Sequence, residues 1–195
     1  MSARNTTAPP AQVDPTTYRR VLGTIPTAVA VITAAVDHRR VGITVGTLTA
    51  VSLDPPLIAF FVRRSSAKFA VVRDAGRFCV NVLAQLQGDL CYAFASKQDG
   101  EFDPDFWAVD PGRPPRARNA VAWLDCKIDS VFGAGDHFGV MGRLLDLAAS
   151  GQPVEPLIFH RGALSGVHPA THEGAAARVG PGLTDGPRRI GLRSA

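Results

Sequence analysis

VGITVGTLTAVS, residues 41–52, combines β-branched residues with two glycines, Gly42 and Gly46. Valine, isoleucine and threonine favour strands, whereas glycine weakens a strand and commonly marks a point where a ligand or another backbone comes close. The breaker Asp54-Pro55-Pro56 ends this stretch, and a second apolar strand follows at residues 57–62. The stretch therefore predicts strand structure that lies beside a ligand or another part of the chain.

Both flanks of this stretch add further strands. Residues 28–35 are rich in Val, Ile and Thr and predict a buried strand, which a polar turn at 37–40 joins to residues 41–52 as a hairpin. In contrast, residues 101–119 contain four prolines and predict a long surface loop. Later strands are predicted at 78–83, 123–132, 137–147 and 157–164.

Only three short helices accompany these strands. The first covers residues 15–22 after an Asp14 N-cap, and its apolar face consists of Tyr18, Val21 and Leu22. The second covers residues 66–73 under a Ser66 cap, and the third covers 86–95. Because helices and strands do not alternate regularly, a doubly wound parallel sheet is disfavoured. The hairpin signals favour an antiparallel barrel.

One glycine string resembles a dinucleotide fingerprint but lacks its context. Gly133, Gly135 and Gly139 form a GxGxxxG pattern, and such a pattern binds a pyrophosphate only where it opens a helix. The residues that follow include two glycines and a valine and make a poor helix. A tight hairpin that carries His137 is the better interpretation.

The chain has 195 residues, which suits one compact domain. We expect disordered tails at residues 1–12 and 168–195 and a folded domain at 13–167. No apolar run approaches the ~20 residues that a membrane span needs, and the N-terminus has no apolar signal segment. These features predict a cytoplasmic protein.

The charge and the cysteines argue against several function classes. The formal net charge is +4, but much of the excess comes from arginines in the two tails, so the central part is close to neutral and nucleic-acid binding is disfavoured. The three cysteines, Cys79, Cys91 and Cys126, share no metal-ligand spacing. We expect Cys79 and Cys126 to be small core residues, and we expect neither a metal site nor a disulfide.

Six motifs in order resemble the flavin reductase family of FMN-binding split barrels, the short reductases that serve two-component flavin monooxygenases. The motifs lie at residues 27–33, 42–47, 51–57, 78–83, 135–138 and 156–162. The resemblance covers residues 14–167. It implies a mainly β fold, namely an antiparallel Greek-key split β-barrel with a few short flanking helices.

The resemblance also implies which residues bind the flavin. Gly42 and Ile43 would face the isoalloxazine ring. The residues that would hold the ribityl chain and phosphate are Thr44, Gly46 and Thr47. The next flavin-lining strand would supply Phe61, Val62 and Arg63, and the phosphate-facing turn would supply Ser66, Ala67 and Lys68. Hydroxyls, backbone amides and a lysine suit such an anion.

The nicotinamide nucleotide would contact a different set of residues. His137 resembles the histidine of a Gly-Asp-His motif that lines the nicotinamide pocket, and it is the candidate catalytic residue. Asp136 is interpreted as a turn residue. The segment that would close over NAD(P)H consists of Phe159, His160, Arg161 and Gly162.

These residues imply an NAD(P)H:flavin oxidoreductase that transfers hydride from NADH or NADPH to FAD or FMN. The reduced flavin would diffuse to a separate monooxygenase, and the chain would form a homodimer with the flavin near the subunit interface. Two alternatives stay open. One is a split-barrel flavoprotein whose tightly bound flavin acts directly on a small organic substrate, and the other is a non-catalytic flavin- or haem-binding module.

Overall fold

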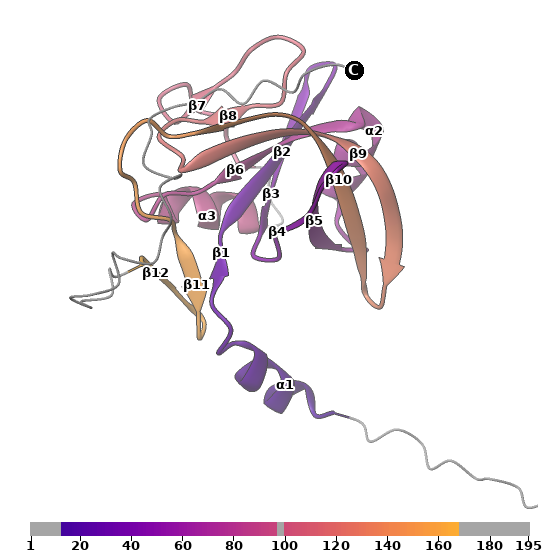
Figure 1. Cartoon of the computed structure of the whole chain (residues 1–195), viewed down its shortest axis with the longest axis vertical. Helices are drawn as coiled ribbons and strands as arrows, with labels where there is room; N and C mark the ends of the chain where they lie inside the picture. Colours follow the sequence, from indigo (N-terminus) through magenta and orange to yellow (C-terminus); the bar gives the residue numbers. More distant parts are fainter. Residues whose placement is uncertain (1–12, 97–99, 168–195) are drawn as a thin grey trace, which may run out of the picture.

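A computed structural model describes residues 13–96 and 100–167. The predicted tails at 1–12 and 168–195 lie outside the described residues. The fold is mainly β, and its largest element is a seven-stranded sheet in the order β3-β2-β6-β9-β10-β5-β4 (Figure 1). Every pair in this sheet is antiparallel. The sheet order has open ends at β3 and β4, so the fold is a split barrel rather than a closed one.

Hairpins build most of this sheet. The strands are β2 (Ala30–Val36), β3 (Arg39–Val45), β4 (Thr49–Leu53), β5 (Pro56–Arg63), β6 (Arg77–Val82), β9 (Ala122–Ala134) and β10 (His137–Ala149). The predicted turn between β2 and β3 is confirmed, and it centres on Asp37 and His38. The predicted turn between β9 and β10 is also confirmed, with Gly135 at φ +62°. The GxGxxxG string therefore belongs to a hairpin and not to the start of a helix.

The stretch at 41–52 departs from the single strand that its composition suggests. β3 ends at Val45, residues 46–48 form a bend, and β4 begins at Thr49. Gly46 marks the break, because a Cβ there would lie 3.0 Å from the Thr27 hydroxyl oxygen. The bend connects the two open ends of the sheet.

The described residues form three helices, α1 (Pro15–Leu22), α2 (Ala67–Ala75) and α3 (Gly88–Ala95), of which α2 and α3 pack against the sheet. Both predicted caps are confirmed, since the Asp14 carboxylate accepts from the Thr17 amide and the Ser66 hydroxyl accepts from the Phe69 amide. α3 begins two residues later than the predicted start at 86. α2 packs Phe69 and Val72 onto the barrel core, in which the rings of Phe60 and Phe78 meet edge to face.

Residues 101–119 are not only a surface loop. They contain a short hairpin of β7 (Trp107–Ala108) and β8 (Arg116–Ala117). Trp107 is 1% exposed and packs against Phe94 of α3 and Phe102, with ring centroids 5.0–5.1 Å apart. The prolines suggested an exposed loop, but the buried Trp107 side chain packs this segment against α3.

The predicted strand at 157–164 is two strands. β11 (Ile158–His160) and β12 (Ala163–Ser165) form a hairpin, and the turn between them places Arg161 at φ +51° and Gly162 at φ +82°. β11 pairs with β1 (Thr27–Ala28), so these strands make a separate three-stranded sheet. Glycine tolerates such a left-handed conformation, which suits Gly162, whereas Arg161 adopts it as a non-glycine residue.

All three cysteines are free and buried, so the expected core positions of Cys79 and Cys126 are confirmed. Burial raises the pKa of the Cys126 thiol to about 12 and raises the pKa of Cys79 further. Both side chains therefore stay neutral at physiological pH and lack the thiolate that nucleophilic chemistry needs.

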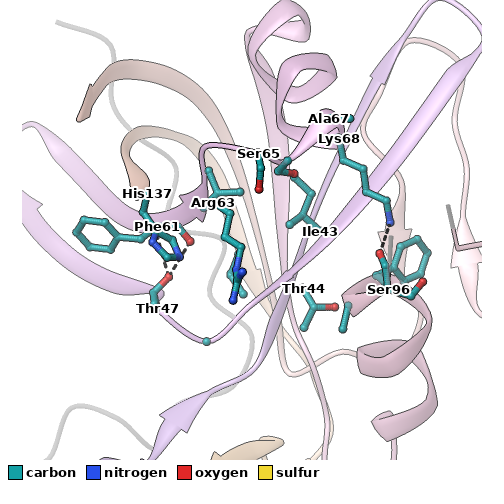
Figure 2. Close-up of a pocket in the computed structure, with 16 residues that line it drawn as sticks. Ile43, Thr44, Thr47, Phe61, Arg63, Ser65, Ala67, Lys68, Ser96 and His137 are labelled. Carbon is teal, nitrogen blue, oxygen red and sulfur yellow. Dashed lines mark hydrogen bonds between the residues drawn. The ribbon is translucent and has the colours of Figure 1, made fainter. Parts of the chain in front are cut away.

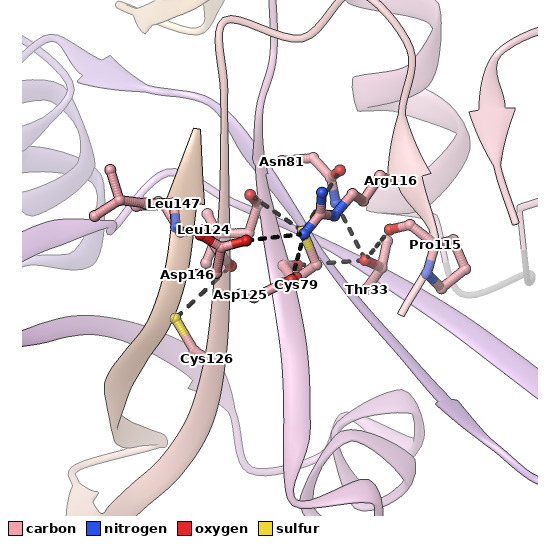
Figure 3. Close-up of polar contacts among 11 residues, drawn as sticks. Thr33, Cys79, Asn81, Pro115, Arg116, Leu124, Asp125, Cys126, Asp146 and Leu147 are labelled. Atoms are coloured by element: carbon pink, nitrogen blue, oxygen red, sulfur yellow. Dashed lines mark hydrogen bonds and ion pairs between the residues drawn. The ribbon is translucent and has the colours of Figure 1, made fainter. Parts of the chain in front are cut away.

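A buried polar network attaches β8 to the main sheet (Figure 3). The Asn81 amide nitrogen donates to the carbonyl of Val31 and to the hydroxyl of Thr33, and its oxygen accepts from the Ala117 amide at 2.7 Å. Arg116, beside Ala117, forms an ion pair with Asp125 of β9. Asn81 is fully buried. Among the described residues, β8 has a strand partner, β7, on one side only, and on the other side the Asn81 side chain accepts the hydrogen bond of the Ala117 amide.

We predict that Asn81→Ala destabilises the domain by about 2–5 kcal/mol, because it leaves the buried Ala117 amide without its acceptor and removes two further buried hydrogen bonds. Urea unfolding followed by circular dichroism measures the free energy of unfolding. Gln152→Ala, at an exposed position, is the control and should change it by less than about 0.5 kcal/mol. Equal stability of the two variants would contradict this role for Asn81.

Candidate functional site

A cavity of about 620 Å³ opens where the bend at 46–48, the end of β5, the start of α2, the end of α3 and the start of β10 meet (Figure 2). Such a volume is typical of small-molecule sites. Its lining is Ile43, Thr44, Val45, Gly46, Thr47, Phe61, Val62, Arg63, Ser65, Ser66, Ala67, Lys68, Phe94, Ala95, Ser96 and His137.

Most of the residues that the sequence singled out meet in this one cavity. Those from the bend, from β5, from the α2 turn and from the β10 start converge although they lie far apart along the chain. They are Ile43, Thr44, Gly46, Thr47, Phe61, Val62, Arg63, Ser66, Ala67, Lys68 and His137.

Five candidates do not line the cavity. A Cβ at Gly42 would lie 2.3 Å from the Phe94 ring, so this glycine lets α3 approach β3. The others are in the β11–β12 hairpin, which pairs with β1 and whose turn binds the Gly23 carbonyl through the Arg161 amide. This second group consists of Phe159, His160, Arg161 and Gly162.

Sequence reasoning also missed part of the lining. Val45 and Ser65 are neighbours of predicted residues and could have been included on that ground. Phe94 and Ala95 of α3, and Ser96 directly after it, carry no local signal. They reach the cavity because α3 packs beside β3, where the Thr44 hydroxyl donates to the Cys91 carbonyl at 2.8 Å.

One end of the cavity is suited to an anion. Ser65, Ser66 and Ala67 lie at the amino end of α2, where the helix dipole favours negative charge. Arg63 immediately precedes this turn, and Figure 2 shows its side chain extending across the pocket between Phe61 and Ile43. A guanidinium and a helix terminus are each groups that bind phosphate.

The Lys68 side chain makes a contact within the protein, although the sequence predicted that its charge would face a phosphate. Its side chain is 8% exposed, and its ammonium donates to the Ser96 carbonyl at 3.1 Å across the other side of the cavity (Figure 2). A cation at the carboxyl end of α3 is favourable. Lys68 thus ties the start of α2 to the end of α3.

Thr47 also holds two segments together. Its hydroxyl accepts from the Phe61 amide at 2.9 Å and donates to the Phe61 carbonyl at 3.2 Å. These two bonds fasten the bend to β5 where no strand ladder is present. The hydroxyl therefore fixes the shape of the cavity wall.

His137 lies on the same side of the cavity as Phe61 and Thr47 (Figure 2). Its Nδ1 is 2.7 Å from the Asp136 carboxylate. The hydrogen bond with His137, followed by the charge of that ring, lowers the pKa of Asp136. An ionised Asp136 accepts the Nδ1 proton, and this hydrogen bond fixes the orientation of the ring. Asp136 is thus more than a turn residue.

Among residues 13–96 and 100–167, no cluster of His, Cys, Asp or Glu side chains could hold a metal ion. Within the same residues, no helix has the length and apolar character to span a membrane.

Comparisons with known proteins agree with this architecture. The flavin reductase of Pseudomonas putida is 40% identical over 155 residues, which cover 79% of this chain and 91% of that protein. The reductase subunit HsaB of a flavin-dependent monooxygenase from Mycobacterium tuberculosis is 37% identical over 160 residues, covering 82% of this chain and 86% of the subunit.

A solved structure is similar over nearly all of its own length. The NADH:FAD oxidoreductase SgcE6 of Streptomyces globisporus, in complex with NAD and FAD fragments, superposes with a TM-score of 0.75 at 29% identity. The match covers 83% of this chain and 99% of SgcE6. The family described as flavin reductase like domain matches residues 22–168. The chain therefore belongs to the flavin reductase family.

Proposed function

We propose that this chain is an NAD(P)H:flavin oxidoreductase that transfers hydride from NADH or NADPH to FAD or FMN and releases the reduced flavin to a separate monooxygenase. The observation that carries the proposal is the division of one cavity into an apolar wall and an anion-binding end. The family of the chain and the names of its relatives support the same reaction.

The cavity fits a flavin nucleotide in its chemistry. Ile43, Val45, Val62 and Phe94 offer apolar surface to a planar ring. The amino end of α2 and Arg63 offer hydrogen bonds and positive charge to a phosphate. A site with only one of these halves would suit either an apolar ligand or an inorganic anion, whereas the two together suit a ring system with a phosphorylated chain.

The protein's own groups would bind and orient rather than move protons. When bound, the flavin supplies the hydride-accepting chemistry, so the protein needs no metal and no acid–base pair of its own. Arg63 and the α2 turn would hold the phosphate, and the apolar wall would exclude water. We propose that His137, held by Asp136 through Nδ1, orients the nicotinamide by presenting Nε2 to the cavity.

We further propose that the chain forms a homodimer. On β5, Ile58, Phe60 and Val62 point into the core, yet the alternate residues Leu57, Ala59 and Phe61 are apolar as well. Leu57 and Phe61 remain partly exposed on the outer face, and exposed apolar side chains that are close together suit a surface that a second copy covers. In such a dimer, the β11–β12 turn of one subunit, with Phe159 to Gly162, would close over NAD(P)H in the pocket of its partner.

We predict that NADH or NADPH oxidation by the purified chain under anaerobic conditions requires added FAD or FMN. Gel filtration should also separate the flavin from the protein, since a diffusible product must leave the site. Absorbance at 340 nm and 450 nm follows both substrates. Stoichiometric flavin retained through gel filtration, with turnover of an organic substrate in its place, would favour the tightly bound flavoprotein.

We predict that Arg63→Ala weakens FMN binding about tenfold or more, because a charge-assisted contact to phosphate contributes about 1.5–3 kcal/mol. Riboflavin, which lacks the phosphate, should bind both proteins equally. Fluorescence quenching measures both dissociation constants, and Arg77→Ala, at an exposed site outside the cavity, is the matched control. An equal loss for riboflavin and FMN would contradict a phosphate contact.

We predict that His137→Ala lowers kcat/KM for the nicotinamide nucleotide while the dissociation constant of the flavin changes little. Asp136→Asn should lower kcat/KM in the same direction but by less, because the ring remains while its tautomer is no longer fixed. Steady-state kinetics measures both. Asp37→Asn changes the corresponding turn aspartate of the β2–β3 hairpin and should have no effect. Unchanged kinetics in both His137 and Asp136 variants would remove the proposed role.

A further inference from the structure

Helix α1 has no apolar surface to pack on within the described residues. None of its residues is buried, and Tyr18, Val21 and Leu22 on its apolar face are 55%, 49% and 43% exposed. Figure 1 shows α1 projecting away from the sheet, joined to it through β1. A helix of two turns is marginally stable alone in water and depends on packing of its apolar face. A surface outside this arrangement must therefore cover α1.

A second cavity, of about 810 Å³, has the chemistry to receive such a helix. It lies on the side of α3 opposite the candidate flavin pocket, between α3, the 105–106 and 118–119 segments and residues 153–155. Its apolar lining includes Leu86, which is 96% exposed, and Phe106, which is 54% exposed. Large exposed apolar side chains gathered in one groove indicate an interaction site.

The charges of the helix and the groove are complementary. α1 carries Arg19 and Arg20 in its last turn, and its acidic cap, Asp14, lies at the opposite end. The groove is lined by three carboxylates, from Asp89, Asp105 and Glu155. Its own arginine, Arg118, donates through Nε to the Pro104 carbonyl. An apolar helix face with adjacent arginines matches an apolar groove with acidic edges.

We propose that α1 of one copy docks in the groove beside α3 of a second copy, and that the exchange is reciprocal. A two-fold arrangement requires each subunit to donate one helix and to offer one groove. The proposal adds a second contact surface to the homodimer proposed above, besides the outer face of β5, and rests on that dimer. Because Phe94 and Ala95 on the inner side of α3 line the flavin pocket, the partner's helix would support the outside of the same wall.

A cysteine pair tests the contact directly. Val21→Cys combined with Ala93→Cys places one thiol on the apolar face of α1 and one on the exposed groove side of α3, while the native cysteines are buried. Mild oxidation should give a covalent dimer on a non-reducing gel, and Val21→Cys with Val51→Cys, on an exposed site of β4, is the control. A dimer band no stronger than the control overturns the proposal. So does an intramolecular disulfide, since α1 would then occupy its own groove.

A charge exchange tests the complementarity. Arg19→Glu with Arg20→Glu should raise the dimer dissociation constant at least tenfold in light scattering, and adding Asp89→Arg with Glu155→Arg should restore it. Arg39→Glu with Arg40→Glu, another exposed pair of adjacent arginines, is the matched control. Dimerisation that is insensitive to the first pair, or that is not restored by the second, overturns the proposal.

Experiments can refute the proposed reductase function and the proposed docking contact independently of each other. A wild-type chain that is monomeric at all concentrations but oxidises NADH with added flavin refutes the docking and leaves the reductase intact. A chain that forms the disulfide-linked dimer but binds no flavin retains the docking and refutes the reductase.

Discussion

The two hydrogen bonds between the Thr47 hydroxyl and the Phe61 backbone hold together the part of the barrel where strand pairing stops. β3 and β4 are the open ends of the sheet, and the bend that connects them lies outside the strand pairing. With the bend fastened to β5, its residues face the amino end of α2 and the beginning of β10. The same break in pairing that makes the barrel split therefore makes the cavity, since an uninterrupted ladder would place side chains where the ligand belongs.

The polar groups of the site come from residues that are adjacent in the sequence, whereas its apolar wall comes from segments that are far apart in the sequence. His137 and Asp136 are neighbours in a tight turn, so their 2.7 Å contact needs only local geometry. The anion-binding end likewise comes from consecutive residues, Arg63 to Ala67, at a strand-to-helix junction. The apolar wall, in contrast, needs α3 to lie against β3. Orientation of small polar groups is thus encoded locally, and the depth of the pocket depends on tertiary packing.

The same distinction explains how much the sequence could predict. The caps at Asp14 and Ser66 and the turn at Gly135 were predictable, because each depends on a few adjacent residues. The family motifs led to most of the cavity lining. The burial of Trp107 was not predicted, because the prolines of residues 101–119 suggested a surface loop. The α3 residues of the cavity were not predicted either, because the packing of a helix beside a strand has no local sequence signal. The β11–β12 segment was linked to the nicotinamide by resemblance, yet in the single chain it pairs with β1 and stays outside the pocket.

The Phe94 ring lies between two glycines, since a Cβ at Gly42 or at Gly100 would come within 3 Å of it. Substitutions at Gly42, Phe94 and Gly100 are consequently not independent of one another during evolution. A methyl group gained at either glycine would have to coincide with a smaller residue at 94, and that smaller residue would in turn enlarge the pocket beneath α3. Covariation among these positions in homologous chains would then track the size of the ring system that each enzyme accepts.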